Sequence, residues 1–142
     1  MSVATSEMGG DCPEALLEAQ TIAARSWLMA SEEQKHKDLG IDACNDDCCQ
    51  RYQGIKNISA KAKSAALNTR GKFVIYNNKI CDTRYSKSCG GISENNENVW
   101  DDNPKEYMRG IFDGRGNFPD FSDEEQLNKW IFEPQDCYCN NE

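Results

Sequence analysis

The strongest structural signal in the chain is the run Cys12-Pro13-Glu14-Ala15-Leu16-Leu17-Glu18-Ala19-Gln20-Thr21-Ile22-Ala23-Ala24-Arg25-Ser26-Trp27. Pro13 suits the first turn of a helix, because the N–H that proline lacks has no helical partner there. Apolar side chains then recur three or four residues apart, which predicts a helix with one buried face. That face would consist of Leu16, Ala19, Ala23 and Trp27. Glu14 would lie at the mouth of this helix, where a side chain can face a cleft.

A second helix and a hairpin follow. Residues 58–68 favour a short helix with Arg70-Gly71 as its stop signal, and its inward side chains would be Ile58, Ala62, Ala65 and Ala66. The runs 72–76 and 79–85 are rich in β-forming residues. Asn77-Asn78 separates them, and this pair tolerates the positive φ of a two-residue turn. The sequence therefore predicts a β-hairpin here.

The last part of the chain combines a loop with a helix. Residues 86–103 are rich in Ser, Asn and Gly, so we expect a long loop, and such loops are usually functional. Ser122-Asp123-Glu124-Glu125 has the pattern of a capping box and predicts a helix over residues 123–132. Helices and strands are mixed without alternating, so we expect a single α+β domain over residues 1–142.

Charge is unevenly distributed along the 142 residues, whose formal net charge is −8. Residues 50–90 contain nine Lys or Arg and one acid, Asp82. This stretch is either a face that binds a polyanion or an ordinary solvated helix and hairpin. The net negative charge and the lack of interleaved aromatic residues argue against a nucleic-acid partner. No apolar run is long enough to span a bilayer, and the first residues lack a signal-peptide pattern.

The opening run, together with residues 3–8, resembles the stage II sporulation protein D (SpoIID/LytB) family. The family hallmark is Glu-Ala-Leu-x-Ala-Gln-x-x-Ala-Ala-Arg, and residues 14–25 match it with one additional residue, because two residues instead of one separate Leu16 from Ala19. Three further pieces follow in the family's order: Cys44 to Tyr52, Thr69-Arg70-Gly71, and Tyr85-Ser86-Lys87-Ser88-Cys89-Gly90-Gly91 leading to Glu94 and Val99-Trp100. Together the four pieces span residues 3–112, and we expect the fold and activity of that family.

The resemblance implies a lytic transglycosylase that cleaves peptidoglycan glycan strands, with Glu14 as its catalytic acid. Cleavage of a glycosidic bond needs a carboxylic acid that protonates the leaving oxygen. The 6-hydroxyl of the sugar can then close on the anomeric carbon to give a 1,6-anhydro end, so one acid can suffice. The alternative is structural, because an acid in a first helical turn commonly complements the helix dipole. Glu7 and Glu94 also fall at family motif positions and would be accessory.

The same resemblance nominates substrate-binding residues. They are Gln20, Arg25, Tyr85, Ser86, Ser88, Gly90, Gly91 and Trp100. Hydroxyl groups and close backbone approach at a Gly-Gly loop suit a sugar chain. The usual family loop reads His-Ser-x-Ser-Gly-Gly, whereas Ser86 here replaces the histidine and Cys89 the last serine. We expect this loop to meet Glu14 at one cleft; a loop without a ligand is the alternative.

Eight cysteines in 142 residues point to cross-links. His36, Cys44, Cys48 and Cys49 occupy the positions where family members have a metal-ligand cluster of histidines and cysteines, so the resemblance implies a structural zinc site. The alternative is a disulfide framework suited to an exported protein. It would pair Cys81 with Cys89, and Cys12 with Cys137 or Cys139.

The resemblance also implies location and partners. The family works outside the cytoplasmic membrane, so we expect an extracytoplasmic, cell-envelope protein. Its partners would be peptidoglycan glycan strands and other cell-wall hydrolases. LytB-type relatives suggest a second reading, a non-catalytic module that binds wall glycan or enhances an amidase.

Overall fold

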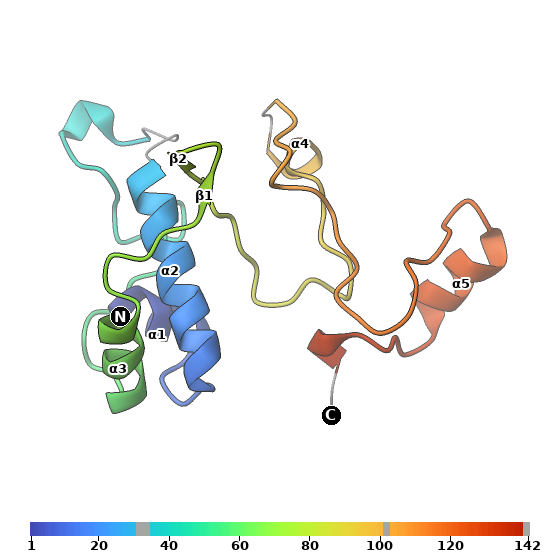
Figure 1. Cartoon of the computed structure of the whole chain (residues 1–142), viewed down its shortest axis with the longest axis horizontal. Helices are drawn as coiled ribbons and strands as arrows, with labels where there is room; N and C mark the ends of the chain where they lie inside the picture. The colour runs from blue at the N-terminus through green and yellow to red at the C-terminus, as the bar shows by residue number, and fades with distance from the viewer. Residues whose placement is uncertain (31–34, 101–102, 141–142) are drawn as a thin grey trace. The chain divides into compact units, whose positions relative to one another are not determined.

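A computed structural model describes residues 1–30, 35–100 and 103–140. The described residues contain five α-helices and one two-stranded antiparallel sheet, which agrees with the expected α+β class. The chain divides into two compact units, Met1–Lys87 and Ser88–Glu142. Figure 1 shows α1 to α3 and the hairpin in the first unit, and α4 and α5 in the second.

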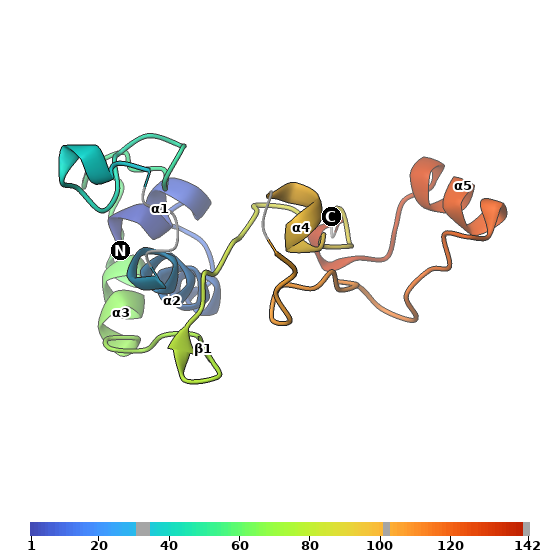
Figure 2. The same ribbon diagram turned by 90° about the horizontal axis from the view of Figure 1, so that it is seen from above.

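Three helices form the body of the first unit: α1 (Ser2–Met8), α2 (Glu14–Ala30) and α3 (Ala60–Asn68). Both α1 and α3 pack against α2, as the view from above in Figure 2 also shows. Leu17 of α2 lies fully buried against Ala62 and Ala65 of α3. Small alanine side chains allow the two helices to approach closely, so one leucine fills the space between them.

The buried face of α2 differs from the predicted one by about one residue. Its buried side chains are Leu17, Gln20, Thr21, Ala24 and Ser26. The prediction of Leu16 and Ala19 was wrong, since Leu16 is 41% exposed and Ala19 is exposed; Ala23 and Trp27 are half-buried. The reason is that three of the five buried residues are polar, and a search for apolar periodicity does not detect them.

The second helix and the hairpin are present as predicted, but the strands have two residues each instead of the predicted runs 72–76 and 79–85. The Ser59 hydroxyl caps α3 by accepting from the Ala62 N–H at 3.1 Å, so the helix begins two residues later than expected. Strands β1 (Ile75–Tyr76) and β2 (Lys79–Ile80) pair antiparallel, with Ile75 opposite Ile80. Asn77 and Asn78 have φ values of 48° and 60°. These values confirm the predicted turn between them.

The second unit contains α4 (Asn96–Val99), α5 (Glu124–Phe132) and the 3₁₀ helix η2 (Tyr138–Asn140). The prediction of one long loop over residues 86–103 was therefore wrong at α4, and residues 101–102 lie outside the described chain. Isolated bridges join Ile92 to Phe112 and Gly114 to Cys137. Trp130 of α5 meets the rings of Phe112 and Phe121 edge-on, with centroids 6.0 and 5.7 Å apart.

The last helix is present as predicted, but its cap lies one residue later. Asp123 accepts from the N–H groups of Glu125 and Gln126, at 2.9 and 3.4 Å. The Ser122 hydroxyl donates to Asp120 instead, at 2.6 Å. A carboxylate is a stronger acceptor for the helical N–H groups than a hydroxyl, because it also complements the helix dipole.

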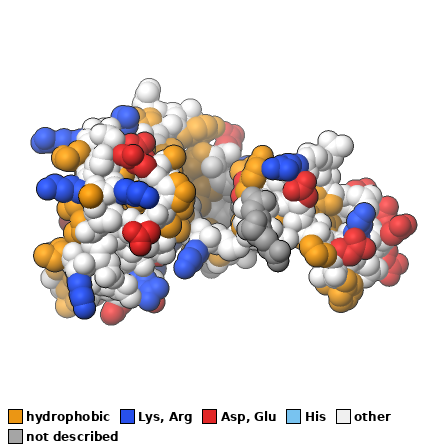
Figure 3. All heavy atoms as spheres, turned by 90° about the horizontal axis from the view of Figure 1, so that it is seen from below, with side chains coloured by type: hydrophobic (Ala, Val, Ile, Leu, Met, Phe, Trp, Pro, Cys, Tyr) orange, Lys and Arg blue, Asp and Glu red, His pale blue; other side chains and the backbone are white. Residues whose placement is uncertain are grey.

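Charge separates between the units. The first has 12 Lys and Arg against 11 Asp and Glu, and the second has 4 against 13. The basic run of residues 50–90 is thus balanced by acids within its own unit. Figure 3 shows Lys and Arg side chains dispersed over the first unit and Asp and Glu side chains gathered over α5. Across the described residues, no helix combines the length and apolarity that a membrane span requires.

Candidate functional site

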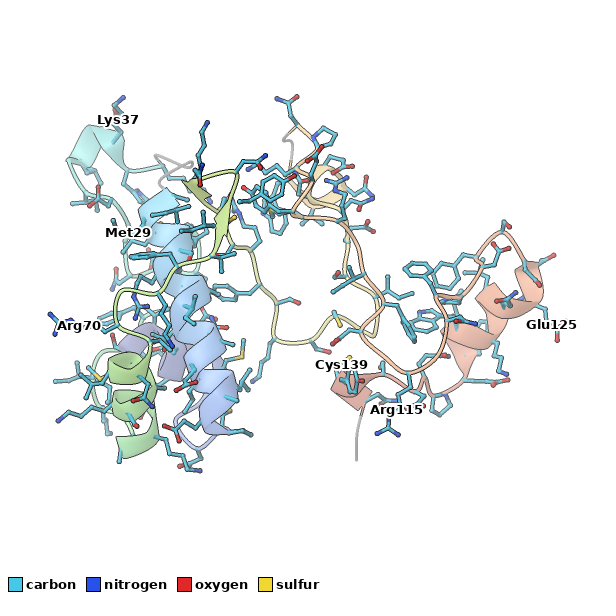
Figure 4. All side chains as sticks on the ribbon, viewed as in Figure 1. Met29, Lys37, Arg70, Arg115, Glu125 and Cys139 are labelled. Atoms are coloured by element: carbon cyan, nitrogen blue, oxygen red, sulfur yellow. The ribbon has the colours of Figure 1, made fainter. Side chains whose placement is uncertain are left out.

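The predicted cluster of His36, Cys44, Cys48 and Cys49 forms in the first unit. Each residue offers one ligand atom, and these four atoms lie within 4.8 Å of one another. Cys44 Sγ is 3.3 Å from Cys48 Sγ, which is 3.8 Å from His36 Nε2. Figure 4 labels Lys37, the first residue of the 3₁₀ helix η1 (Lys37–Leu39), which directly follows His36. Three thiols and one imidazole so placed can hold a metal ion.

The thiols of this cluster differ in their readiness to lose a proton. The Asp46 N–H, 3.4 Å from Cys44 Sγ, is the main cause that lowers the pKa of Cys44, and Cys48 adds to it. The same contact with Cys44 raises the pKa of Cys48 to about 11. Without a metal, Cys44 is therefore the thiol that loses its proton more readily than Cys48.

The loop that carries these cysteines is fastened to α1 and α2. Gln50 Nε2 donates to the Ala24 carbonyl at 3.0 Å. The Arg51 N–H donates to Glu7 Oε1 at 2.9 Å, and the Gln53 N–H to Ser6 Oγ at 2.9 Å. Glu7, which the motif suggested as an accessory acid, thus holds the cysteine loop in place.

Glu14 is exposed in the first turn of α2. Asn68, the last residue of α3, directs its side-chain amide at two acids: Nδ2 lies 3.4 Å from Glu14 Oε1 and 3.2 Å from Glu18 Oε1. Asn68 was not predicted from the sequence. Its one signal is its position directly before Thr69-Arg70-Gly71, and the spacing does not reveal its contact with residues 54 and 50 positions earlier.

Gln20 and Tyr85 lie inside the first unit. Gln20 is 4% exposed, and its Nε2 has no hydrogen-bond partner of normal geometry among the described residues. The Tyr85 hydroxyl donates to Glu7 Oε1 at 3.3 Å. Burial first, and then the negative charge of Glu7, raise the pKa of Tyr85, so it stays a neutral donor.

Arg25 has a structural partner set. Its Nη1 donates to the carbonyl oxygens of Thr69 and Lys72, at 2.7 and 2.9 Å, and its guanidinium lies 5.9 Å from the Phe73 ring centre. The side chain therefore clamps α2 to the turn before the hairpin. A substrate role for Arg25 stays a prediction.

The other nominated substrate residues span both units. Ser86, the next residue after Tyr85, is exposed in the first unit, while Ser88, Gly90, Gly91 and Trp100 belong to the second. Ser88 and Gly90 are exposed, and Trp100 is half-buried. Gly91 is buried at a φ of +90°, and a Cβ there would lie 2.8 Å from Cys137 Cβ. Gly91 is thus required by packing, and the meeting of this loop with Glu14 stays a prediction.

The alternative disulfide framework would join Cys12 and Cys81 of the first unit to cysteines of the second unit, and it stays a prediction. The Cys12 thiol donates to the Met8 carbonyl at 2.9 Å. Cys89 lies instead beside Cys139, with 4.0 Å between their sulfurs.

The structure describes a small α+β protein whose helices hold a thiol-rich loop with a His and Cys cluster that could bind a metal ion. Residues 1–76, more than half of the chain, match the family described as "Stage II sporulation protein", SpoIID. The chain belongs to the SpoIID family.

The remaining comparisons add little about activity. The chain is similar to an uncharacterized protein of Brachyspira hyodysenteriae, at 32% identity over 94 residues. The matched region is 66% of this chain and 26% of the relative, so the chain corresponds to about a quarter of that protein. No solved structure matches the chain. Family membership links the chain to a sporulation-related role at the cell wall.

Proposed function

We propose that this protein is a lytic transglycosylase that breaks the MurNAc–GlcNAc bond of peptidoglycan. SpoIID membership over residues 1–76, a range that contains Glu14, carries the proposal. The Glu14 carboxylic acid donates its proton to the leaving glycosidic oxygen as the bond to the anomeric carbon breaks. The resulting carboxylate then takes the proton of the sugar's 6-hydroxyl, whose oxygen closes on that carbon and leaves a 1,6-anhydro end.

The surroundings of Glu14 support this role. Its side chain is exposed at the open end of α2, where a polymer can reach it. Asn68 holds one carboxylate oxygen through its amide, which fixes the direction of the acid. Gln20 belongs to the proposal through its family position, and its amide nitrogen is buried without a normal partner among the described residues. In this proposal Arg25, Tyr85 and Ser86 of the first unit bind the glycan strand, and so do Ser88, Gly90, Gly91 and Trp100 of the second unit.

The His36, Cys44, Cys48 and Cys49 set is proposed to hold zinc. Zinc prefers four N or S ligands in structural sites, and the Cys₃His set is one of the common ones. The four ligand atoms already lie within 4.8 Å of one another. The ion would tie η1 to the cysteine loop and so fix the segment that Gln50 and Arg51 fasten to α2 and α1. Its role is structural, because it lies on the loop and Glu14 carries the chemistry.

The proposed activity sets location and partners. Peptidoglycan lies outside the cytoplasmic membrane, so the protein acts in the cell envelope. Its substrate is the glycan strand, and other cell-wall hydrolases act on the same polymer.

A second candidate function is a non-catalytic module that binds wall glycan or enhances an amidase. The Gly-Gly loop favours it, because Ser86 and Cys89 replace the histidine and last serine of the family pattern. Cys89 moreover points to Asp113 and Cys139, with its sulfur 3.7 Å from Asp113 Oδ2 and 4.0 Å from Cys139 Sγ. It is therefore engaged within the second unit and is a poor substitute for a sugar-binding serine.

Two variants of α2 separate the candidates. Glu14→Gln removes the acid and keeps the side-chain shape, and Glu18→Gln is its matched control one turn further along, with the same partner Asn68. Both variants should bind purified glycan strands like the wild type. A transglycosylase loses cleavage in Glu14→Gln and keeps most of it in Glu18→Gln. If the wild type binds strands without cleaving them and stimulates an amidase, the second candidate is correct.

A further inference from the structure

Three cysteines and one acid gather in the second unit, whereas the predicted metal cluster belongs to the first. Cys137 Sγ lies 3.6 Å from Cys139 Sγ, which lies 4.0 Å from Cys89 Sγ. Cys89 Sγ in turn lies 3.7 Å from Asp113 Oδ2. Cys139, labelled in Figure 4, belongs to η2 near the end of the chain.

Backbone hydrogen bonds hold the three segments that carry these side chains. The Asp113 N–H donates to the Gly91 carbonyl at 2.7 Å, which ties residue 113 to the segment after Cys89. The Tyr138 N–H donates to the Asp113 carbonyl at 2.9 Å, between Cys137 and Cys139. Asp113 is thus bonded on both sides, and its position relative to all three thiols is set by the fold.

The side chain of Cys137 is buried and closely packed. Cys137 is only 4% exposed. A Cβ at Gly91 would come within 2.8 Å of Cys137 Cβ and 3.1 Å of its sulfur, so only glycine fits beside it. The cluster therefore has one buried thiol, one half-buried thiol and one exposed thiol, Cys139, through which an ion can enter.

The distances between the ligand atoms of these residues fit a zinc site better than a disulfide. A disulfide needs sulfurs about 2.05 Å apart, which none of the measured sulfur pairs approaches. Tetrahedral bonds of about 2.3 Å to zinc separate two sulfurs by about 3.8 Å, and a carboxylate oxygen from a sulfur by about 3.5 Å. Along the row Cys137, Cys139, Cys89 and Asp113 the successive separations are 3.6, 4.0 and 3.7 Å, which lie close to these values.

We propose that Cys89, Asp113, Cys137 and Cys139 form a second zinc site, with three thiolates and one carboxylate as ligands. Zinc accepts sulfur and carboxylate oxygen together, whereas magnesium and calcium avoid sulfur. Binding forms three Zn–S bonds and one Zn–O bond and releases the thiol protons to solvent. The site would join residue 89 to residues 137 and 139, and so hold the two ends of the second unit together.

Metal stoichiometry tests the site on the full chain. Wild type, Cys139→Ser and the matched control Cys12→Ser are saturated with zinc, desalted and analysed for metal per chain. Serine at residue 12 keeps the donor to the Met8 carbonyl and leaves both clusters intact. We expect Cys12→Ser to equal the wild type and Cys139→Ser to hold about one zinc ion fewer. Because the test compares the zinc content of the variant with that of the wild type, its result does not depend on whether the first cluster also binds zinc.

A second variant and a second measurement test the site in case Cys139→Ser does not fold. Asp113→Asn keeps the side-chain shape and all three thiols, and should weaken zinc at this site at least about tenfold in chelator competition. In the wild type, added zinc should protect Cys89, Cys137 and Cys139 from alkylation, as mapped by peptide mass spectrometry. Equal zinc content in wild type and folded Cys139→Ser would overturn the proposal. So would unprotected thiols in the zinc-loaded wild type, or a native disulfide among the three.

Discussion

Breaking the first cysteine cluster should destabilise the protein by a predictable amount. Cys48→Ser removes the thiol that contacts both Cys44 and His36. The ligands run from His36 to Cys49, a segment of 14 residues. Closing a loop of that length stabilises the folded state by about 3 kcal/mol. The loop is also hydrogen-bonded to α1 through Arg51 and to α2 through Gln50, so releasing the loop weakens its contacts with both helices.

The expected decrease in the melting temperature follows from the number of residues in the chain. Unfolding entropy near the melting temperature is about 2.1 cal/mol/K per residue. For 142 residues melting together, a loss of about 3 kcal/mol lowers Tm by about 10 °C. Differential scanning calorimetry of the zinc-loaded protein measures this shift, with Cys12→Ser as the control that leaves both clusters intact. Refutation would be a Tm that neither chelator nor Cys48→Ser moves, because then no metal closes this loop.

Three further results follow from contacts in the structure. Arg25→Ala removes two hydrogen bonds to carbonyl oxygens and should cost about 1.5–3 kcal/mol in urea unfolding; unchanged stability with lost glycan binding would instead assign Arg25 to the substrate. Gly91→Ala should lower the Tm more than Gly116→Ala, since both glycines have positive φ but only Gly91 abuts Cys137; equal shifts would disprove the close packing. In metal-free protein, the alkylation of Cys139 should have its midpoint near pH 7, because the Ser88 side chain and then Cys137 lower the pKa of this thiol to about 7. The reactive thiolate forms above that pH, and Ser88→Ala should move the midpoint upward. A midpoint at the pKa of an ordinary thiol would contradict the assigned contacts.

Local signals predicted the hairpin and the helices α2, α3 and α5, and the family resemblance predicted the first cysteine cluster. Asn77-Asn78 predicted the turn because few residues accept positive φ. The cluster of His36 and three cysteines was predicted from the family resemblance, because its members occupy the positions of the family's metal ligands.

Long-range contacts could not be predicted in the same way. The buried face of α2 was misplaced because Gln20, Thr21 and Ser26 are buried, and polar residues leave no apolar period. The grouping of Cys89 with Cys137 and Cys139 depends on backbone pairing through Asp113, which no spacing in the sequence indicates. Asn68 reaches Glu14 only because α3 packs on α2.

The most direct test of the central claim is the mass of the products released from peptidoglycan. Wild-type protein is incubated with glycan strands that keep their stem peptides and with strands stripped of them. We expect 1,6-anhydro ends from at least one of the two, and none when Glu14→Gln replaces the wild type. Reducing ends in place of anhydro ends, or anhydro ends still formed by Glu14→Gln, would contradict the assignment of Glu14 as the acid of a lytic transglycosylase.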